Sequence, residues 1–353
     1  MSLVFVNMKV KQVTITFWVL LFLTEAKLAP TLRLNNGYEM PVIGFGTFQA
    51  SPGDCERSVK DAIDIGYRHI DTAFVYGNEI EVGKAVRAKI DEGVIKREDI
   101  FITTKLWSTF HEPDQVEKVF QRSSDNLNLT YVDLYLIHFP SALQRVPKNK
   151  TDASGDVNTF DKLPRGKDGK VLTADVDYLD TWHAMEKLVE SGRVRSIGLS
   201  NFNSEQTERV LSNSKIKPVT NQVECHPNLN QRKLIEFSAA RNITITAYSP
   251  LGRPSTTSSN GKNLAISDPK VLELGKKYNK TPAQIILRYT VQNGAIVIPK
   301  SIHKNRIEEN FNILDFEISA SDMEILHGIN DNIRLSSFDD LKDDKYYPFN
   351  IEF

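Results

Sequence analysis

Short apolar runs alternate with longer amphipathic stretches along most of the chain. Eight runs after residue 30 are rich in β-branched and aromatic residues, as strands are. They span residues 42–47, 69–73, 100–106, 132–139, 195–201, 219–225, 243–249 and 295–301. The stretches between them repeat apolar residues at helical spacing, as at Val59, Ala62 and Ile63. The pattern predicts strands and helices in strict alternation.

Signals for helix ends fall where this alternation needs them. Pro113 stands at an expected helix start, and Gly192 follows another expected helix as its cap. Thr281 and Gln284 form a capping box, with Pro282 at the first helical position. These signals support the helices that the apolar spacing predicts.

Eight strands, each followed by a helix, predict a single (β/α)8 barrel of the α/β class, with residues 27–353 as its domain. A doubly wound parallel sheet is the alternative that the same alternation allows. Asn36-Gly37 lies between two short alternating runs and predicts an N-terminal β-hairpin, which would cover the bottom of the barrel. The polar segment 141–177 far exceeds the usual connection of about 2–6 residues, so long loops are expected at the C-terminal face.

Composition and charge exclude several classes of function. The chain has 353 residues, with 44 Lys and Arg against 45 Asp and Glu, and a net charge of −1. That balance predicts no basic surface for nucleic acid. The two cysteines, Cys55 and Cys225, predict neither a disulfide framework nor a metal site.

Residues 1–26 differ from the rest of the chain. Lys9 and Lys11 precede an apolar run from Val13 to Leu23, and the small residue Ala26 follows. This order is typical of a secretory signal peptide, and the run is shorter than the ~20 residues that a membrane-spanning helix needs. We therefore expect a secreted protein without a stable membrane anchor. A buried N-terminal strand, in a cytoplasmic protein, is the alternative.

The stretch GFGTFQ, residues 44–49, looks like the front of a dinucleotide-binding loop. However, Gln49 occupies the third glycine position of G-x-G-x-x-G, and residues 51–53 (Ser-Pro-Gly) separate the stretch from any helix. A Rossmann turn needs its helix to open inside the loop, so that the helix N-terminus meets the pyrophosphate. We interpret the stretch as the first barrel strand and its loop.

Four polar residues lie at the predicted carboxyl ends of adjacent strands, where barrels of this kind carry their chemistry. They are Asp71, Tyr76, Lys105 and His138. Each alone has an ordinary explanation: a core histidine, a structural ion pair, or a tyrosine packed at the rim of the barrel. Their position at the same end of adjacent strands favours a catalytic site. An ammonium lowers the pKa of a nearby tyrosine, a carboxylate holds that ammonium, and a neutral histidine orients a carbonyl oxygen. The group fits protonation of an oxygen while another molecule supplies a hydride.

Seven sequence blocks extend these four residues into a recognisable order. They are GYRHIDTAFVYGNE (66–79), ITTKLW (102–107), DLYLIHFP (133–140), IGLSNFN (197–203), NQVECHP (221–227), AYSPLG (247–252) and IPKSIHKNRIEENF (298–311). In these blocks the chain resembles the aldo-keto reductase family over nearly all of residues 31–353. The resemblance implies an NADPH-dependent reductase of aldehydes and ketones. Asp71, Tyr76, Lys105 and His138 would be its catalytic residues, with Tyr76 as the proton donor.

The resemblance also assigns residues to the cofactor. NADPH would be bound by Thr47, Asp71, Ser200, Asn201, Gln222, Tyr248, Ser249, Leu251, Lys300, Ser301, Arg306, Glu309 and Asn310. Tyr248 would stack on the nicotinamide, and Lys300, Ser301 and Arg306 would hold the 2′-phosphate. The residues themselves support the last assignment, because cations that follow a strand at the start of a helix suit a phosphate.

The resemblance places the substrate among aromatic side chains. Phe48, Trp107, His138 and Phe139 would line the pocket, and Tyr346, Tyr347 and Phe349 near the chain's end would close it. Many relatives have Trp where this chain has Phe48 and Phe139. The difference leaves the catalytic residues unchanged, but it leaves the identity of the substrate open. Such a pocket favours large apolar ketones or aldehydes over free sugars, since burial is worth ~25 cal/mol per Å².

Two refinements of function remain open. With its leader, the chain resembles the secreted insect members that reduce 3-dehydroecdysteroids. A redox-sensing module that binds the cofactor but turns over little is the alternative function. A short-chain dehydrogenase is disfavoured, because no tyrosine in the chain has a lysine four residues on. The expected partner is a small carbonyl compound, and a monomer is expected.

Overall fold

The computed structural model describes residues 9–10, 13–14, 28–147, 161–252 and 264–353. Strands β1 (Lys9–Val10) and β2 (Val13–Thr14) form a short antiparallel pair. The predicted signal peptide comprises residues 1–26, and apart from these two strands it lies outside the described residues. Its role as a leader therefore stays a prediction.

Eight parallel strands form the central sheet. They are β5 (Phe45–Gly46), β6 (His69–Asp71), β7 (Phe101–Leu106), β8 (Val132–Ile137), β9 (Val194–Ser200), β10 (Thr220–Glu224), β11 (Thr244–Tyr248) and β12 (Ala295–Val297). Their order in the sheet follows their order in the chain. Ile43 pairs with Val297 in an isolated parallel bridge, so the first and last strands meet. The sheet closes into a barrel, and the doubly wound alternative is wrong.

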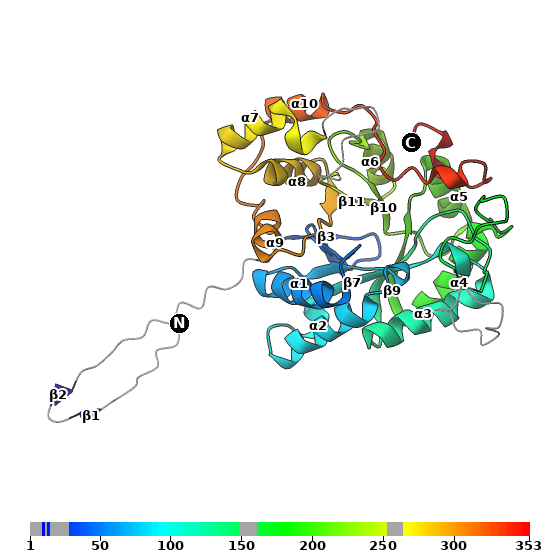
Figure 1. Cartoon of the computed structure of the whole chain (residues 1–353), viewed down its shortest axis with the longest axis horizontal. Helices are drawn as coiled ribbons and strands as arrows, with labels where there is room; N and C mark the ends of the chain where they lie inside the picture. The colour runs from blue at the N-terminus through cyan, green and yellow to red at the C-terminus, as the bar shows by residue number, and fades with distance from the viewer. Residues whose placement is uncertain (1–8, 11–12, 15–27, 148–160, 253–263) are drawn as a thin grey trace.

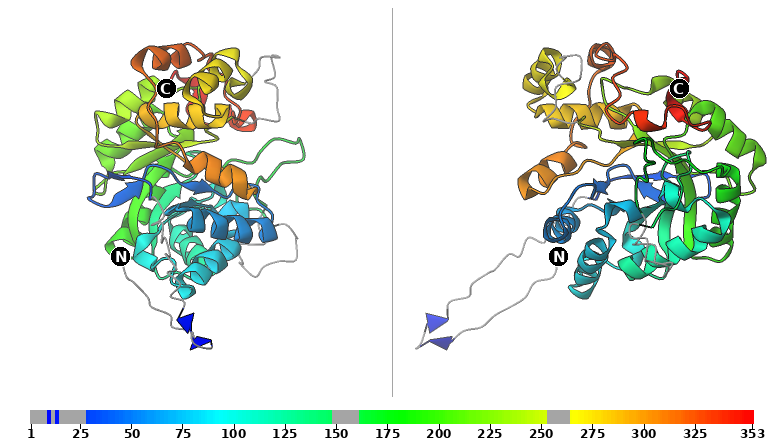
Figure 2. Two further views of the ribbon diagram at one scale, coloured as in Figure 1. Left: turned by 90° about the vertical axis from the view of Figure 1, so that its left-hand side faces the viewer. Right: turned by 45° about the vertical axis from the view of Figure 1, so that its right-hand side comes forward.

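Helices cover the outside of this barrel (Figures 1 and 2). One follows each strand: α1 (Pro52–Ile65), α2 (Glu79–Asp91), α3 (Pro113–Leu127), α4 (Tyr178–Glu190), α5 (Ser204–Asn213), α6 (Arg232–Ala239), α8 (Pro282–Gln292) and α9 (Lys304–Phe311). Two further helices, α7 (Pro269–Tyr278) and α10 (Ala320–His327), pack against α8 around Leu274, Ile285 and Leu326. The predicted (β/α)8 barrel is confirmed.

The helix ends agree closely with the sequence signals. Pro113 is the first residue of α3, and Thr281 and Gln284 form the reciprocal capping box that opens α8. Gly192 lies one residue beyond the cap of α4, with a φ of 74° that suits glycine. The first strand is shorter than predicted, because regular pairing in the segment 42–47 is confined to β5.

A hairpin of β3 (Thr31–Arg33) and β4 (Glu39–Pro41) precedes the barrel, as predicted from Asn36-Gly37. Its apolar residues Leu34 and Met40 are buried in a cluster at the amino ends of the strands, together with Phe101, Leu134, Leu136, Val219 and Ile296. The Asn36 side chain donates to Ser196 Oγ at 2.9 Å. The hairpin therefore closes the bottom of the barrel, and ligands must reach the interior from the carboxyl ends of the strands.

Alternation along β8 decides which side chain reaches that open end. Leu134 and Leu136 belong to the cluster inside the barrel, whereas Tyr135 and Ile137 pack outside among the helices. His138, the next residue on the inner face, follows directly at the carboxyl end. The interior is too narrow for a side chain at Gly44, where a Cβ would lie 2.3 Å from Nδ1 of His69. That contact gives the GFG motif a role in packing.

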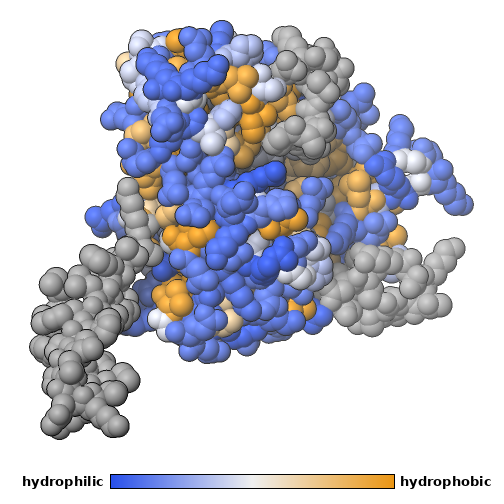
Figure 3. Space-filling view, turned by 60° about the vertical axis from the view of Figure 1, so that its left-hand side comes forward, coloured by the Kyte–Doolittle hydropathy of each residue, from blue (hydrophilic) through white to orange (hydrophobic). Residues whose placement is uncertain are grey.

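The surface is largely polar on the face drawn in Figure 3, where hydrophobic side chains form small, separated groups. Groups of that size are ordinary on a water-exposed surface. Among the described residues, no helix combines the length and the apolar character needed to cross a membrane.

Candidate active site

The four predicted catalytic residues come together at the carboxyl ends of neighbouring strands. Asp71 ends β6, Lys105 lies near the end of β7, and His138 follows β8. Tyr76 ends the short helix η1 (Phe74–Tyr76) in the loop after β6. Parallel strands bring these positions to one level, because β6, β7 and β8 are adjacent and in register.

Lys105 is the centre of the group. Its Nζ donates to Asp71 Oδ1 at 2.5 Å and to the Tyr76 hydroxyl at 3.3 Å. A third donation, to the carbonyl of Thr72 at 2.8 Å, uses the remaining N–H of an ammonium. The side chains of Lys105 and Asp71 are 0% and 3% exposed, so this ion pair lies out of contact with water. The other carboxylate oxygen of Asp71 accepts from Gln222 Nε2 at 2.8 Å.

Burial decides the protonation of Tyr76 and His138. Burial, the Asp71 carboxylate and Tyr248 raise the pKa of Tyr76 well above its usual value. The expectation that the ammonium lowers this pKa is therefore wrong, because burial and the carboxylate outweigh it. Burial, with the nearby Lys105, lowers the pKa of His138 well below its usual value. At neutral pH the site thus has a tyrosine that holds its proton beside an uncharged imidazole.

Aromatic rings surround the reacting end of this group. The His138 ring lies 5.7 Å from the Tyr76 ring and 5.1 Å from the Trp107 ring, edge to face in both cases. Phe48 lies 5.0 Å from Tyr76 on the other side and is 52% exposed. Nδ1 of His138 is buried without a hydrogen-bond partner in the structure. The His138 ring therefore lies between the rings of Tyr76 and Trp107 at the reacting end of the group.

The residues predicted to bind the nicotinamide end adjoin the same space. Asn201 follows β9, donates to the carbonyl of His138 at 2.9 Å and accepts from the Tyr248 hydroxyl at 2.8 Å. Ser200 Oγ donates to the carbonyl of Gln222 at 2.8 Å. Asn201 and Ser249 have positive φ angles of 63° and 48°, which turn the chain sharply after β9 and β11. The structure therefore gathers these predicted residues beside the catalytic group.

Other predicted cofactor residues lie along the edge next to β12. Thr47 is buried and donates to the carbonyl of Asp71 at 3.1 Å, and Leu251 packs against the core. Ser301, Glu309 and Asn310 surround the start and the inner face of α9, where Glu309 accepts from Thr281 at 2.6 Å. Lys300 and Arg306 are exposed, and neither takes part in an ion pair within the described part of the chain. Two unpaired cations at this edge suit an anion.

Several of the aromatic residues predicted to line a substrate pocket pack together. Phe139 is buried and packs with Leu143, Leu341 and Tyr347, with Trp107 and Phe349 against them. Phe338, which the sequence did not single out, lies 4.7 Å from the Phe139 ring. It lies between Leu335 and Leu341 in the tail, and no sequence signal set it apart from them.

Two details depart from the sequence analysis. Tyr346 faces Tyr178 of α4 at 4.9 Å and does not join the cluster around Phe139, because the chain turns here, with the amide of Tyr347 donating to the carbonyl of Asp344 at 3.0 Å. Lys162, in the long loop after β8, was not predicted at all. Its carbonyl accepts from the Trp107 indole at 2.6 Å, and its Nζ donates to the carbonyl of Val75 at 2.5 Å. The long loop therefore reaches the rim of the site, while its residues 148–160 lie outside the described residues.

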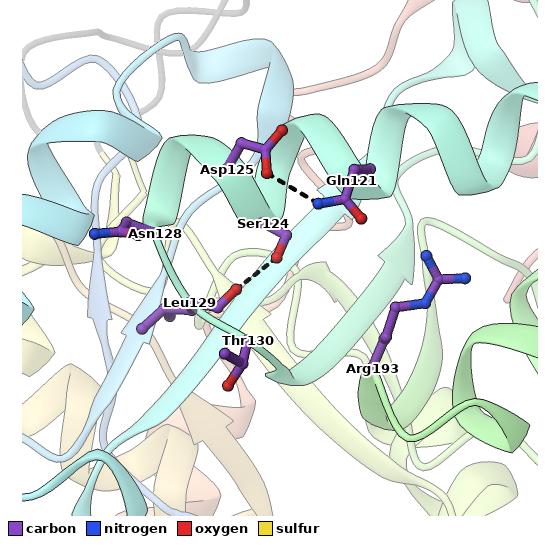
Figure 4. A pocket seen from close by; sticks show the side chains of 7 residues that line it. All are labelled: Gln121, Ser124, Asp125, Asn128, Leu129, Thr130 and Arg193. Atoms are coloured by element: carbon purple, nitrogen blue, oxygen red, sulfur yellow. Dashed lines mark hydrogen bonds between the residues drawn. The ribbon is translucent and has the colours of Figure 1, made fainter.

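A separate depression of about 310 Å³ lies far from this site (Figure 4). Its lining residues come from the end of α3 and the turns that precede β8 and β9, including Asp125, Thr130 and Arg193. Those turns are at the amino ends of the strands, opposite to His138. The depression therefore takes no part in the chemistry of the four catalytic residues.

Comparison with known proteins agrees with this geometry. A sequence model of the Aldo/keto reductase family matches residues 42–331. The chain belongs to the aldo/keto reductase family. This aldo/keto reductase is 46% identical over 306 residues to zebrafish (Danio rerio) aldo-keto reductase family 1 member A1-A, covering 86% of this chain and 90% of that one. It is 43% identical to mouse (Mus musculus) estradiol 17 beta-dehydrogenase 5, covering 90% and 97%.

Solved structures give the same result for the aldo/keto reductase fold. The aldose reductase of Schistosoma japonicum superposes with a TM-score of 0.83 at 41% identity, covering 92% of this chain and 99% of that one. An aldo-keto reductase of Bombyx mori, solved in complex with NADP, superposes with a TM-score of 0.81 at 37% identity, covering 92% and 100%. The chain is thus an oxidoreductase with the complete barrel of its relatives.

Proposed function

We propose that this chain uses NADPH to reduce the carbonyl group of large, mostly apolar ketones or aldehydes, with Tyr76 as the proton donor. One observation carries the proposal. Lys105 Nζ lies within hydrogen-bond distance of both Asp71 and the Tyr76 hydroxyl in a buried group beside an uncharged His138.

The hydrogen bonds support proton transfer from Tyr76 to the substrate. The Tyr76 oxygen accepts from Lys105, so its own O–H remains available to donate to a carbonyl oxygen. As that proton leaves, the ammonium stabilises the phenolate, and Asp71 holds the ammonium in place. His138 can donate to the same carbonyl oxygen and fix its orientation. NADPH, when bound, supplies the hydride to the carbonyl carbon.

The residues present fit the cofactor. Lys300 and Arg306 offer two exposed cations next to α9, and phosphate is the group that such cations bind best. Asn201, Ser200 and Gln222 present amide and hydroxyl groups beside Tyr248. The Bombyx mori relative in complex with NADP supports the same choice.

The pocket walls support a large apolar substrate. Phe48 lies against Tyr76, Trp107 against His138 and Phe338 against Phe139. Burying such aromatic surface favours apolar compounds over free sugars. The mouse relative carries estradiol in its name, which supports a steroid-sized ketone. Within this class we choose 3-ketosteroids, including 3-dehydroecdysteroids, as the compounds to test first.

Replacing Tyr76 by Phe tests the chemistry. The variant should bind NADPH as the wild type does, while turnover falls by roughly 10²–10⁴, the usual contribution of a general acid. Tyr38→Phe on the exposed hairpin is the matched control and should change neither quantity. If Tyr76→Phe keeps a third of wild-type turnover, another group donates the proton.

A substrate panel tests the substrate class and the alternative of a redox-sensing module. A 3-ketosteroid, an aromatic aldehyde and glucose should be compared by kcat/KM with NADPH and with NADH. The kcat/KM values for the ketosteroid and the aldehyde should exceed the value for glucose. A glucose value that matches them would contradict the apolar pocket, and NADPH binding without turnover of any carbonyl would favour the sensing module.

We also infer that residues 1–26 direct the chain into the secretory pathway, and the support is the sequence pattern alone. Protein from its own cell type should then appear outside the cell, as a monomer, with a new N-terminus near Lys27. N-terminal sequencing checks the cleavage. Intact intracellular protein that starts at Met1 or Met8 would contradict it.

A further inference from the structure

A second buried carboxylate lies next to the active site and takes no part in the proposed chemistry. Glu224 is the last residue of β10, two positions after Gln222, and is fully buried. Its Oε1 accepts from the amide of Leu335 at 2.7 Å, and its Oε2 accepts from the amide of Ser336 at 2.7 Å. The carboxylate therefore binds the main chain of a segment more than a hundred residues away.

These bonds account for the burial of the charge. Burial alone would raise the pKa of Glu224, but the His226 side chain and the two amides outweigh it and lower the pKa. His226 Nε2 lies 2.9 Å from Oε1 and is itself buried. An ionised carboxylate that accepts from backbone amides makes hydrogen bonds about twice as strong as neutral ones. Glu224 thus attaches the C-terminal segment to the barrel through two hydrogen bonds to its charged carboxylate.

Two asparagines in the loop after Glu224 hold the start of the same segment. The carbonyl of Asn228 accepts from the amide of Ile333 at 3.0 Å, and the amide of Asn230 donates to Asn330 Oδ1 at 3.0 Å. The Asn228 side chain also accepts from the amide of Ala265 at 2.8 Å. The loop after β10 therefore fastens residues 330–333, and Glu224 fastens residues 335 and 336.

The attached segment leads directly into the substrate wall. Ser337 follows Ser336, and its carbonyl accepts from the Tyr347 hydroxyl at 2.6 Å. Phe338 comes next and lies against Phe139, the residue that follows catalytic His138. A shift of the main chain at Ser336 would therefore move the aromatic wall that packs against Phe139. It would leave Asp71 and Lys105, which other strands carry, in place.

We infer that Glu224 is a positioning residue for substrate selection: its carboxylate fixes residues 335–338 so that Phe338 and Tyr347 form a wall against Phe139. The inference rests on the proposed carbonyl reduction and deepens it. A large substrate touches this wall and depends on it, whereas a small aldehyde reacts at Tyr76 and His138 without it. A purely structural role for Glu224 would affect both substrates alike.

Glu224→Gln tests this split, because it keeps the size of the side chain but sets an NH2 group against a backbone amide. For a 3-ketosteroid, kcat/KM should fall about tenfold or more, through KM, as expected for a lost hydrogen bond to a charged group. For a small aldehyde it should stay within about twofold of wild type, and NADPH affinity should not change. Glu273→Gln on the exposed face of α7 is the matched control. Equal losses for both substrates would overturn the inference.

Hydrogen exchange provides a test that does not depend on turnover. In the wild type, the amides of Leu335 and Ser336 should exchange more slowly than their neighbours, and Glu224→Gln should remove that protection. If they exchange freely in the wild type, Glu224 does not hold the segment, whether or not the variant folds. If the wild type reduces neither substrate, the proposed function fails while the exchange result still decides the attachment.

Discussion

Replacing Lys105 by Met should destabilise the protein far more than an ordinary loss of a salt bridge. The change removes three hydrogen bonds and leaves Asp71, which is 3% exposed, as a buried carboxylate without its cation. Breaking one partner of a buried pair costs about 3–5 kcal/mol. The bond from Gln222 to Asp71 remains and keeps the loss within that range.

The double variant Lys105→Met/Asp71→Asn separates the charge from the packing. It removes both charges at once, so it should be less destabilised than the sum of the two single variants, with a coupling of about 1–3 kcal/mol. Urea unfolding of all three variants measures these free energies. Turnover should be lost in each of them.

Lys118→Met is the matched control, because Lys118 pairs with Asp114 on the surface of α3, with side chains 62% and 67% exposed. This variant should lose at most about 1 kcal/mol. If Lys105→Met costs no more than the control, or if the double variant equals the sum of the singles, the buried pair does not hold the site together.

Three further outcomes are expected. Arg306→Ala should weaken the binding of NADPH by about 1.5–3 kcal/mol and leave the binding of NADH nearly unchanged. Titration of both cofactors measures this, and equal weakening of both would contradict the assignment of Arg306 to the 2′-phosphate. Burial lowers the pKa of His69 and His111 to about 3, so below pH ~6.5 the unfolded chain binds more protons than the folded one. These two histidines should therefore lower the free energy of unfolding by about 2–3 kcal/mol from pH ~7.5 to pH ~5.5, and His138, whose pKa burial also lowers, should add to the fall; a constant value would contradict this. Met40→Ala should cost about 2–5 kcal/mol in urea unfolding, and a loss under ~1 would mean that the hairpin does not close the barrel.

The arrangement of the four proposed catalytic residues could be predicted because it follows from local rules. Strand period places Lys105 and His138 on the inner face, and parallel pairing brings Asp71 to the same level. The pKa of Tyr76 was mispredicted because its value depends on how deeply the ring is buried, which no spacing in the sequence reveals.

Contacts between distant loops could not be predicted for a related reason. Lys162 reaches Trp107 and Val75 from a long loop without periodic pattern. Glu224 is a single acidic residue at the end of a mostly polar strand, and its amide partners lie in a tail with little regular structure. Tyr346 and Tyr347 are adjacent, and their opposite directions depend on how the tail is attached.

The seam of the barrel bears on how the chain is made. The first strand segment meets the last through three main-chain hydrogen bonds, from Gly44 to Val297, from Gly46 to Pro299 and from Val297 to Val42. All four proposed catalytic residues precede residue 140. The barrel that brings them together cannot close until β12 has been synthesised. A ribosome-bound chain therefore carries a complete set of catalytic side chains well before it has an active site. Contacts so distant in sequence also make closure slow relative to helix formation, so the exposed strand edges are most vulnerable to aggregation during synthesis.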